Sequence, residues 1–242
     1  MKTIIITGFG SSSPSLRRRT FGPIVTDAEA MFPDAEVRIA FTGRDVIERI
    51  RSRGGEADSL EDALAKAASE GSEEAAVMPT LPIAGGQFRL VQDACSRFSG
   101  RIPVRLCGPL LSSREPISKF LDALPEIFPD AFEEGCALVM MGHGRGAEAD
   151  GNLCMVQHMA DVRGMDAFFV TATGTPSPGD AAELMRRAGV GKAVLAPLMF
   201  EAGFHARRDM AAEDGPVRSA LESAGFDVEC VMKGMGEIPE FR

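Results

Sequence analysis

The sequence predicts an α/β fold made of two similar lobes, each a parallel sheet flanked by helices, with a cleft between them. Short apolar runs alternate with longer amphipathic runs along the whole chain. This alternation is typical of parallel strands covered by helices on both faces. A chain of 242 residues is long enough for two small domains. Segments of the first half also resemble segments of the second half, which indicates that the two lobes are related.

Eight apolar runs predict strands, at residues 2–9, 35–41, 74–80, 103–108, 136–142, 166–173, 192–199 and 227–232. Seven amphipathic runs predict helices, at residues 15–31, 44–53, 59–70, 86–98, 115–127, 180–189 and 205–225. The third helix has a capping serine, Ser59, with Glu61 close behind it. In folds of this class ligands bind beyond the carboxyl ends of the strands. The residues that follow the strands are therefore the candidate site.

Two sequence matches define the internal repeat. Gly8-Phe9-Gly10 matches Gly142-His143-Gly144 at an offset of 134 residues, and residues 75–88 resemble residues 192–205 at an offset of 117. The repeat predicts that Phe9 and Gln87 of the first lobe lie roughly where His143 and His205 lie in the second. Chance similarity between apolar strands is the alternative.

The lobe boundary is expected in a segment rich in proline and acidic residues, PEIFPDAFEEG. We therefore predict an N-terminal α/β lobe at residues 1–128 and a C-terminal α/β lobe at residues 129–242. The C-terminal lobe would carry the histidines of the candidate site.

Charge and composition restrict the partners. The net charge is −9, which argues against nucleic acid or an anionic membrane as a partner. The first apolar run is too short for a signal peptide, and the sequence contains no membrane span, so we expect a cytoplasmic protein. The five cysteines are scattered and form no CxxC motif, which favours free thiols. The sequence leaves a homo-oligomer open.

Two of the three histidines follow predicted strands and lie near glycine. His143 is flanked by glycines that let a ligand approach the backbone closely. His205 begins the predicted helix 205–225, with Glu201 four residues before it and Asp209 four residues after it. A neutral imidazole in such a place can bind a metal or act as a base, although a structural histidine is the alternative.

Other motifs give weaker signals. His158 has no comparable setting and is interpreted as structural. GFGSSSPS lacks the spacing of a phosphate-binding loop, and no GxSxG elbow is present. The arginines at 17–19 are typical of a solvated helix face. Arg44, which follows a strand, is better placed to bind a carboxylate.

The sequence resembles the anaerobic sirohydrochlorin cobaltochelatases of the CbiK type nearly from end to end. The resemblance rests on IIITGFGSSS, FPDAEVRIAFTGRDVIERI, GPLL, MGHG, TGTPS and LAPLMFEAGFHARRDMA. It implies two α/β lobes and insertion of Co²⁺ into a tetrapyrrole without ATP. In relatives the metal is held by the histidine of MGHG, the histidine of an AG-x-HA motif and a carboxylate. The matching histidines are His143 and His205.

The sequence departs from the family at the carboxylate. Relatives carry a glutamate in a motif resembling QPLHIINGEE or in one resembling TVEGYPS. These motifs align with residues 78–88 and 171–177, which puts Gln87 and Thr173 at the acid positions. Both usual acids are therefore missing, and Glu201, close to His205, is a candidate replacement.

The resemblance implies a chelatase that inserts a divalent metal into sirohydrochlorin or a close tetrapyrrole, for cobalamin or sirohaem. Co²⁺ is the first candidate metal, followed by Ni²⁺ and Fe²⁺. His143 and His205 would be the catalytic pair, with Glu201 as a further metal ligand. The residues assigned to the tetrapyrrole are Phe9, Ser11, Arg44, Gln87 and Arg145. Because the usual acid is missing, a weakly catalytic or non-catalytic tetrapyrrole- or metal-binding protein is the alternative. A more distant one is an unrelated enzyme sharing only the two-lobed architecture.

Overall fold

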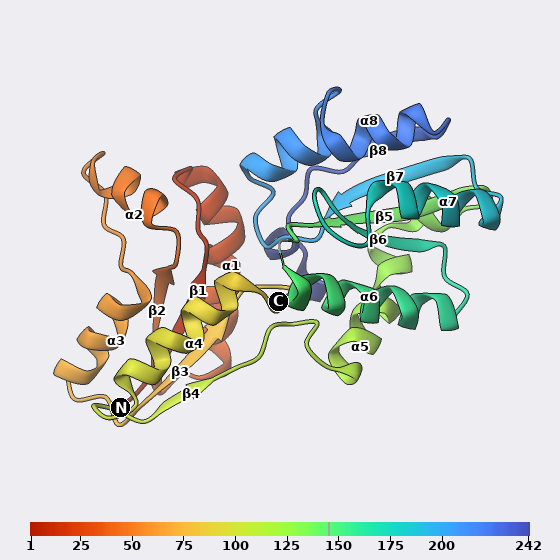
Figure 1. Ribbon diagram of the computed structural model, residues 1–242. Coiled ribbons are helices and arrows are strands. Elements are labelled where there is room, and N and C mark those ends of the chain that lie inside the picture. Colours follow the sequence, from red (N-terminus) through yellow and green to blue (C-terminus); the bar gives the residue numbers. More distant parts are fainter. Residues whose placement is uncertain (145) are drawn as a thin grey trace. The chain divides into compact units, whose positions relative to one another are not determined.

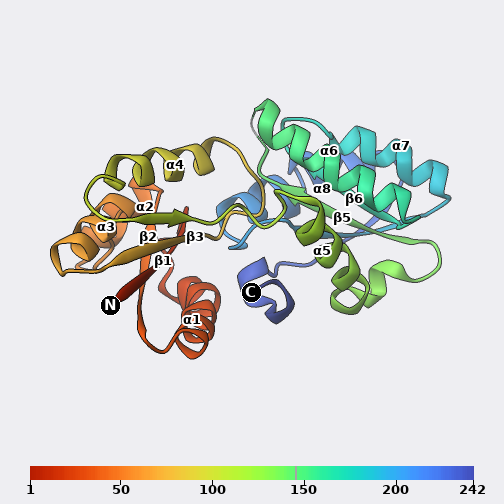
Figure 2. The ribbon, with the colours of Figure 1, turned by 90° about the horizontal axis from the view of Figure 1, so that it is seen from below.

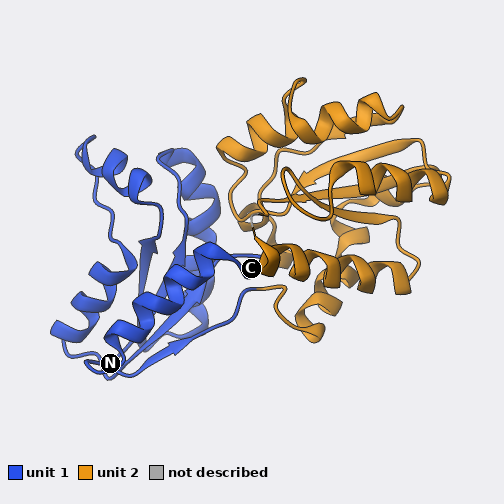
Figure 3. Cartoon of the chain, viewed as in Figure 1, with its two compact units in different colours: residues 1–109, 242 blue, residues 110–241 orange. Residues whose placement is uncertain are grey.

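The chain forms two compact units in the computed structural model, which describes residues 1–144 and 146–242 (Figure 3). Unit 1 comprises residues 1–109 with Arg242, and unit 2 comprises residues 110–241. The division thus falls before helix α5 (Arg114–Ile127), not after residue 128 as the sequence predicted. The reason is packing, because α5 buries Phe120 against Phe169 of unit 2, with ring centroids 6.1 Å apart.

Unit 1 is a four-stranded parallel sheet in the order β2-β1-β3-β4. Its strands are β1 (Lys2–Gly8), β2 (Ala35–Phe41), β3 (Glu74–Pro79) and β4 (Val104–Leu106). Its helices are α1 (Pro14–Met31), α2 (Arg44–Arg51), α3 (Leu60–Ser69) and α4 (Gly86–Phe98). Figure 2 shows α1 and α4 on opposite faces of this sheet. Helices α3 and α4 bury Leu64 and Val91 with Ile5 and Val77 of the sheet.

Unit 2 is a second four-stranded parallel sheet, in the order β6-β5-β7-β8 (Figure 1). Its strands are β5 (Cys136–Gly142), β6 (Ala167–Thr171), β7 (Lys192–Pro197) and β8 (Asp227–Cys230). Its α-helices, besides α5, are α6 (Ala147–Val162), α7 (Pro178–Ala188) and α8 (Pro216–Ser223). Short helical turns cover Pro129–Phe132, Met235–Glu237 and Pro239–Phe241, and a π-helix covers Ala206–Ala211.

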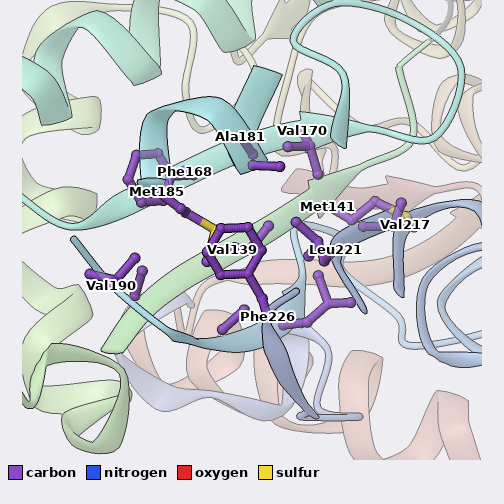
Figure 4. Close-up of a cluster of buried hydrophobic side chains, with 14 of the residues drawn as sticks. Val139, Met141, Phe168, Val170, Ala181, Met185, Val190, Val217, Leu221 and Phe226 are labelled. Atoms are coloured by element: carbon purple, nitrogen blue, oxygen red, sulfur yellow. The ribbon is translucent and has the colours of Figure 1, made fainter. Parts of the chain in front are cut away.

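The core on one face of the second sheet is formed by side chains of β5 and β6 together with α7 and α8. Figure 4 shows Val139 and Phe168 of the sheet packed with Met185 of α7 and Leu221 of α8. These four side chains are at most 5% exposed. Burial of such apolar area is the main force that holds helices on a sheet.

The two units repeat one topology, which confirms the internal repeat. In unit 1, Gly8 pairs with Phe41 and Lys2 pairs with Glu74. In unit 2, Gly142 pairs with Thr171 and Cys136 pairs with Lys192. Between β1 and β5 the equivalent residues are 134 positions apart, as predicted. Between β3 and β7 they are 118 positions apart instead of the predicted 117. The corrected register makes Gln87 the equivalent of His205, and Phe9 remains the equivalent of His143.

Each of the eight predicted strands is present, but two helical segments differ from the prediction. Helix α6 was not predicted; Gly146 directly precedes it, and Gly151 interrupts its sequence pattern. The predicted helix 205–225 is two segments, the π-helix and α8. They are separated at Gly215, where Pro216 begins α8. A Cβ on Gly215 would lie 2.7 Å from the Arg208 carbonyl oxygen, so the chain makes a close turn there.

No helix in the described part of the chain combines the length and the apolar composition needed to cross a bilayer. Each of the five cysteines, all of them described, is a free thiol.

Candidate functional site

His143 is held at the carboxyl end of β5 by the glycine that follows it. Gly142 is the last residue of this buried strand, and the exposed His143 comes next. Gly144 has φ +67°, and a Cβ there would lie 2.7 Å from the Thr171 Cβ at the end of β6. A side chain at position 144 would therefore be both strained and crowded. Gly144 lets the chain turn beside β6 immediately after His143.

His205 follows β7, the neighbour of β5 in the sheet. Leu198 extends the pairing of β7 by donating to the Met141 carbonyl at 2.8 Å. The loop after it is held by the backbone N–H groups of Met235 and Gly236, which donate to Met199 and Phe200 at 2.9 and 3.0 Å. His205 then stands immediately before the π-helix Ala206–Ala211. π-Helical turns are rare and occur frequently at functional sites.

The fold brings the two histidines together. Their ring centroids are 4.1 Å apart, and the ring planes are inclined at 58°. The two imidazole rings are therefore in contact, and a metal ion shared by both is the hypothesis that this contact supports. His158 lies elsewhere, exposed on α6. The sequence predicted this pair from the strand ends, and the adjacency of β5 and β7 brings its members into contact.

His205 has a carboxylate partner in Asp209. His205 Nδ1 lies 2.6 Å from Asp209 Oδ2, and the two side chains are 36% and 27% exposed. Phe204 presents its ring edge-to-face to His205, with centroids 5.6 Å apart, and is 70% exposed. In the sequence Asp209 lies four residues after His205, which is the spacing that makes this contact possible, but the sequence assigned Asp209 no role.

The residues predicted to bind the tetrapyrrole from unit 1 gather at the carboxyl edge of its sheet. Phe9 follows β1 and is 48% exposed. Ser11 Oγ accepts a hydrogen bond from the Ser13 N–H at 3.1 Å. The exposed Arg44 begins α2, after β2. Gln87 lies in the first turn of α4, after β3. Arg145, the fifth predicted residue, is outside the described residues.

The two positions at which the resemblance implies a glutamate hold neutral side chains, Gln87 and Thr173. Gln87 Oε1 accepts a hydrogen bond from Thr42 Oγ1 at 2.8 Å. Thr173 is exposed beyond β6. A carboxylate oxygen of Asp150, on α6, is buried nearby, 2.6 Å from where a Cβ on Gly174 would lie. Gly174 therefore has to be glycine for Asp150 to keep its place.

The described residues contain no group of three His, Cys, Asp or Glu side chains arranged to hold a metal ion. Glu201 is half-buried on the loop before His205, and its carbonyl accepts from the Gly203 N–H at 2.8 Å. Its role as a metal ligand stays a prediction. Of the predicted ligands, the two that the structure brings into contact are His143 and His205.

Comparisons with known proteins identify the family of this chain. The family model of cobalt chelatase (CbiK) matches residues 2–242. A sirohydrochlorin cobaltochelatase of Salmonella typhimurium is 28% identical over 244 residues, which are 100% of this chain and 92% of that protein.

Two solved structures share the fold. SirB from Bacillus subtilis with Fe³⁺ has a TM-score of 0.64 at 12% identity, covering 99% of this chain and 90% of its own. CbiX, the terminal enzyme for biosynthesis of siroheme in denitrifying bacteria, has a TM-score of 0.58 at 18% identity. That match covers 99% of this chain and 94% of CbiX.

Proposed function

The chain belongs to the cobalt chelatase family, and we propose that it inserts Co²⁺ into sirohydrochlorin or a close tetrapyrrole without ATP. The class of enzyme, a chelatase that forms metal–nitrogen bonds, follows from the family. The substrate is proposed from the name of the Salmonella typhimurium relative. The observation that carries the proposal is the contact between His143 and His205 at 4.1 Å between ring centroids.

The two imidazoles would hold the incoming metal before it enters the macrocycle. Imidazole suits Co²⁺, Ni²⁺ and Fe²⁺ alike, so the pair by itself does not select among these metals. Two protein ligands leave the other coordination positions to water and then to pyrrole nitrogens. A small ligand set also suits a protein that has to give its metal away.

Insertion exchanges one metal ion for two protons, because two pyrrole N–H groups are deprotonated as the metal–nitrogen bonds form. A base close to the metal assists this step. Once the metal has passed to the macrocycle, one of the two imidazoles is available to accept one pyrrole proton, and water takes the other. His143, the more exposed of the two residues, is our candidate for that role.

Contacts of the macrocycle remain proposals. Phe9, Ser11, Arg44 and Gln87 are supported by their common place at the carboxyl edge of the first sheet, where ligands of such folds bind. Arg44 would bind a carboxylate of the tetrapyrrole, because a guanidinium matches the geometry of that group. Glu201 is proposed as a further metal ligand because it lies four residues before His205.

A binding protein without catalysis is the less favoured reading. The family match spans residues 2–242, and the Salmonella typhimurium cobaltochelatase aligns over its own length almost completely. The resemblance implies the loss of one ligand, the glutamate, whereas the sequence keeps both histidines. We therefore expect turnover with the two imidazoles, and Glu201 is the candidate to replace the missing carboxylate.

The test is an anaerobic insertion assay. Purified protein is mixed with sirohydrochlorin and Co²⁺, then with Ni²⁺ or Fe²⁺, and absorbance follows formation of the metal complex. His143→Ala and His205→Ala should reduce insertion at least tenfold, whereas His158→Ala, which changes the third and exposed histidine, should not. A spectral shift on binding, with no insertion of any metal, would overturn the catalytic proposal and support the binding protein.

A further inference from the structure

We propose that Asp209 is a positioning residue that fixes His205 in its Nδ1–H tautomer and thereby presents Nε2 to the metal. The proposal rests on the proposed function, in that it takes His205 as a metal ligand. Its starting point is the 2.6 Å contact between His205 Nδ1 and Asp209 Oδ2.

The chemistry of the two groups determines the direction of this hydrogen bond. An ionised carboxylate can only accept hydrogen bonds, so the hydrogen must reside on Nδ1. In the opposite tautomer two lone pairs would face each other at 2.6 Å, which is repulsive. A neutral His205 therefore has its lone pair on Nε2, and this nitrogen is the one left for a metal.

The backbone around Asp209 holds the pair in place. Ala206 and Met210, the residues directly after His205 and Asp209, are fully buried, and Met210 packs in the core of unit 2. The Gly215 N–H donates to the Ala212 carbonyl at 2.8 Å, which closes the turn after the segment. Since the segment is anchored on its apolar side, the carboxylate keeps the imidazole in one orientation and reduces its rotational freedom.

The repeat supplies an independent comparison. Gln87 is the equivalent of His205 in unit 1, and four residues after it stands Val91, a fully buried apolar side chain. The unit without the imidazole thus has no carboxylate at the position of Asp209. Unit 1 forms its helix at this place without a carboxylate, so helix formation alone does not explain Asp209.

A carboxylate that accepts from a metal-bound imidazole orients the ring and makes its other nitrogen more basic. Loss of such a partner typically weakens metal affinity about 10- to 100-fold. We expect Asp209 to act on the metal step only. Its loss should change the affinity for Co²⁺ and kcat, while KM for the tetrapyrrole stays the same.

The experiment compares four variants of the full chain with the wild type. They are Asp209→Ala, Asp209→Asn, His205→Ala and, as the matched control, Asp214→Asn. Asp214 is exposed in the turn that follows the π-helix, so the control makes the same chemical change close by in sequence. Anaerobic Co²⁺ titration by calorimetry gives affinity, and ¹H–¹⁵N correlation spectra of the metal-free protein give the His205 tautomer. The chain has three histidines, so His143→Ala and His158→Ala spectra assign the signals.

Wild-type His205 should show the Nδ1–H tautomer, and Asp209→Ala should show a mixture and bind Co²⁺ about 10- to 100-fold more weakly. Asp209→Asn should recover part of the affinity, because an amide oxygen still accepts from Nδ1. Asp214→Asn should match the wild type. A merely structural role for Asp209 would not alter the tautomer of a folded protein.

The outcomes separate this proposal from the proposed function. Unchanged Co²⁺ affinity in His205→Ala would overturn the proposed metal site itself. If His205→Ala binds Co²⁺ more weakly and Asp209→Ala binds it as the wild type does, the metal site is supported and the proposed role of Asp209 is overturned. If Asp209→Ala fails to fold, the wild-type spectrum decides, since an Nε2–H tautomer in the metal-free protein overturns the proposal without any variant.

Discussion

Gln87 of unit 1 occupies the position that His205 occupies in unit 2. Each residue lies eight positions after the proline that ends its strand, and those prolines pair with Thr7 and Met141 at equivalent places. Gln87 accepts a hydrogen bond from Thr42, whereas His205 contacts His143 and Asp209. One topology thus carries a neutral polar contact in one unit and an imidazole pair in the other. This asymmetry assigns the proposed metal site to unit 2.

The pair of histidines should behave as one site when both are removed. If His143 and His205 bind the same ion, loss of either removes most of the affinity, and the second loss adds little. We expect each single alanine variant to bind Co²⁺ at least tenfold more weakly, about 1.4 kcal/mol. The double variant should lose much less than the sum of the two. Calorimetric Co²⁺ titration of the three variants checks this coupling. Additive losses would show that the two histidines are not coupled, and the loss of one bound equivalent with unchanged affinity would show that each binds its own ion.

Gly144 should be needed for metal binding as well as for stability. Gly144→Ala strains a residue with φ +67° and adds a Cβ 2.7 Å from that of Thr171, which displaces His143. Gly135→Ala is the matched control, because φ is +78° there and nothing lies within 4 Å of the added atom. The strained backbone should cost both variants about 1–2 kcal/mol of unfolding free energy in urea, and crowding against Thr171 should cost Gly144→Ala more. Only Gly144→Ala should lose Co²⁺ affinity. Equal Co²⁺ affinities in the two variants would contradict the close approach to Thr171.

The capping box of α7 should make stability depend on pH. The Ser177 backbone N–H donates to Asp180 Oδ2 at 2.8 Å and lowers the pKa of that carboxyl below its ordinary 3.8. A lowered folded-state pKa contributes stability that is complete above the ordinary value and is lost as the pH falls through the folded value. Asp180→Asn should therefore flatten the change in urea midpoint between pH 7 and pH 3.

The serine of the same capping box can be tested separately. Ser177 Oγ accepts from the Asp180 N–H at 3.2 Å, so Ser177→Ala removes an N-cap and should cost about 1 kcal/mol at pH 7. For the pH dependence, the control for the charge change in Asp180→Asn is Asp214→Asn, which changes an exposed aspartate outside any capping box. If Asp180→Asn and the wild type show the same pH dependence of the urea midpoint, the carboxylate of Asp180 contributes nothing measurable.

Thiol reactivity should distinguish the cysteines by burial. Cys95 is 6% exposed on α4, and burial raises its pKa to about 11, whereas Cys107 and Cys154 are exposed. Only about one thousandth of a thiol with that pKa is ionised at pH 8. A disulfide reagent should therefore modify Cys107 and Cys154 quickly and Cys95 only after urea is added. Mass spectrometry of the modified peptides gives the sites, and rapid native labelling of Cys95 would show that α4 opens.

Local patterns explain which parts of the fold could be predicted. The apolar runs identify all eight strands, because side chains buried on a parallel sheet have to be apolar whatever their partners are. Helix α6 was not predicted because Gly151 weakens its local pattern, and burial of Leu153 and Val156 stabilises it as a helix nevertheless. The segment 205–225 was predicted as one helix because its periodicity hides the close turn at Gly215. Where tertiary packing opposes local propensity, packing decides.

The sequence by itself determined two related α/β halves, the family, and the two histidines placed after strands. The tertiary structure decided which of these residues meet. His143 and His205 are far apart in sequence and come into contact because β5 and β7 are neighbours in the order β6-β5-β7-β8. The local sequence of either strand does not determine this strand order, which results from the packing of the whole unit. The contact of Asp209 with His205 likewise required the three-dimensional path of the π-helix, because a spacing of four residues alone does not show that two side chains touch.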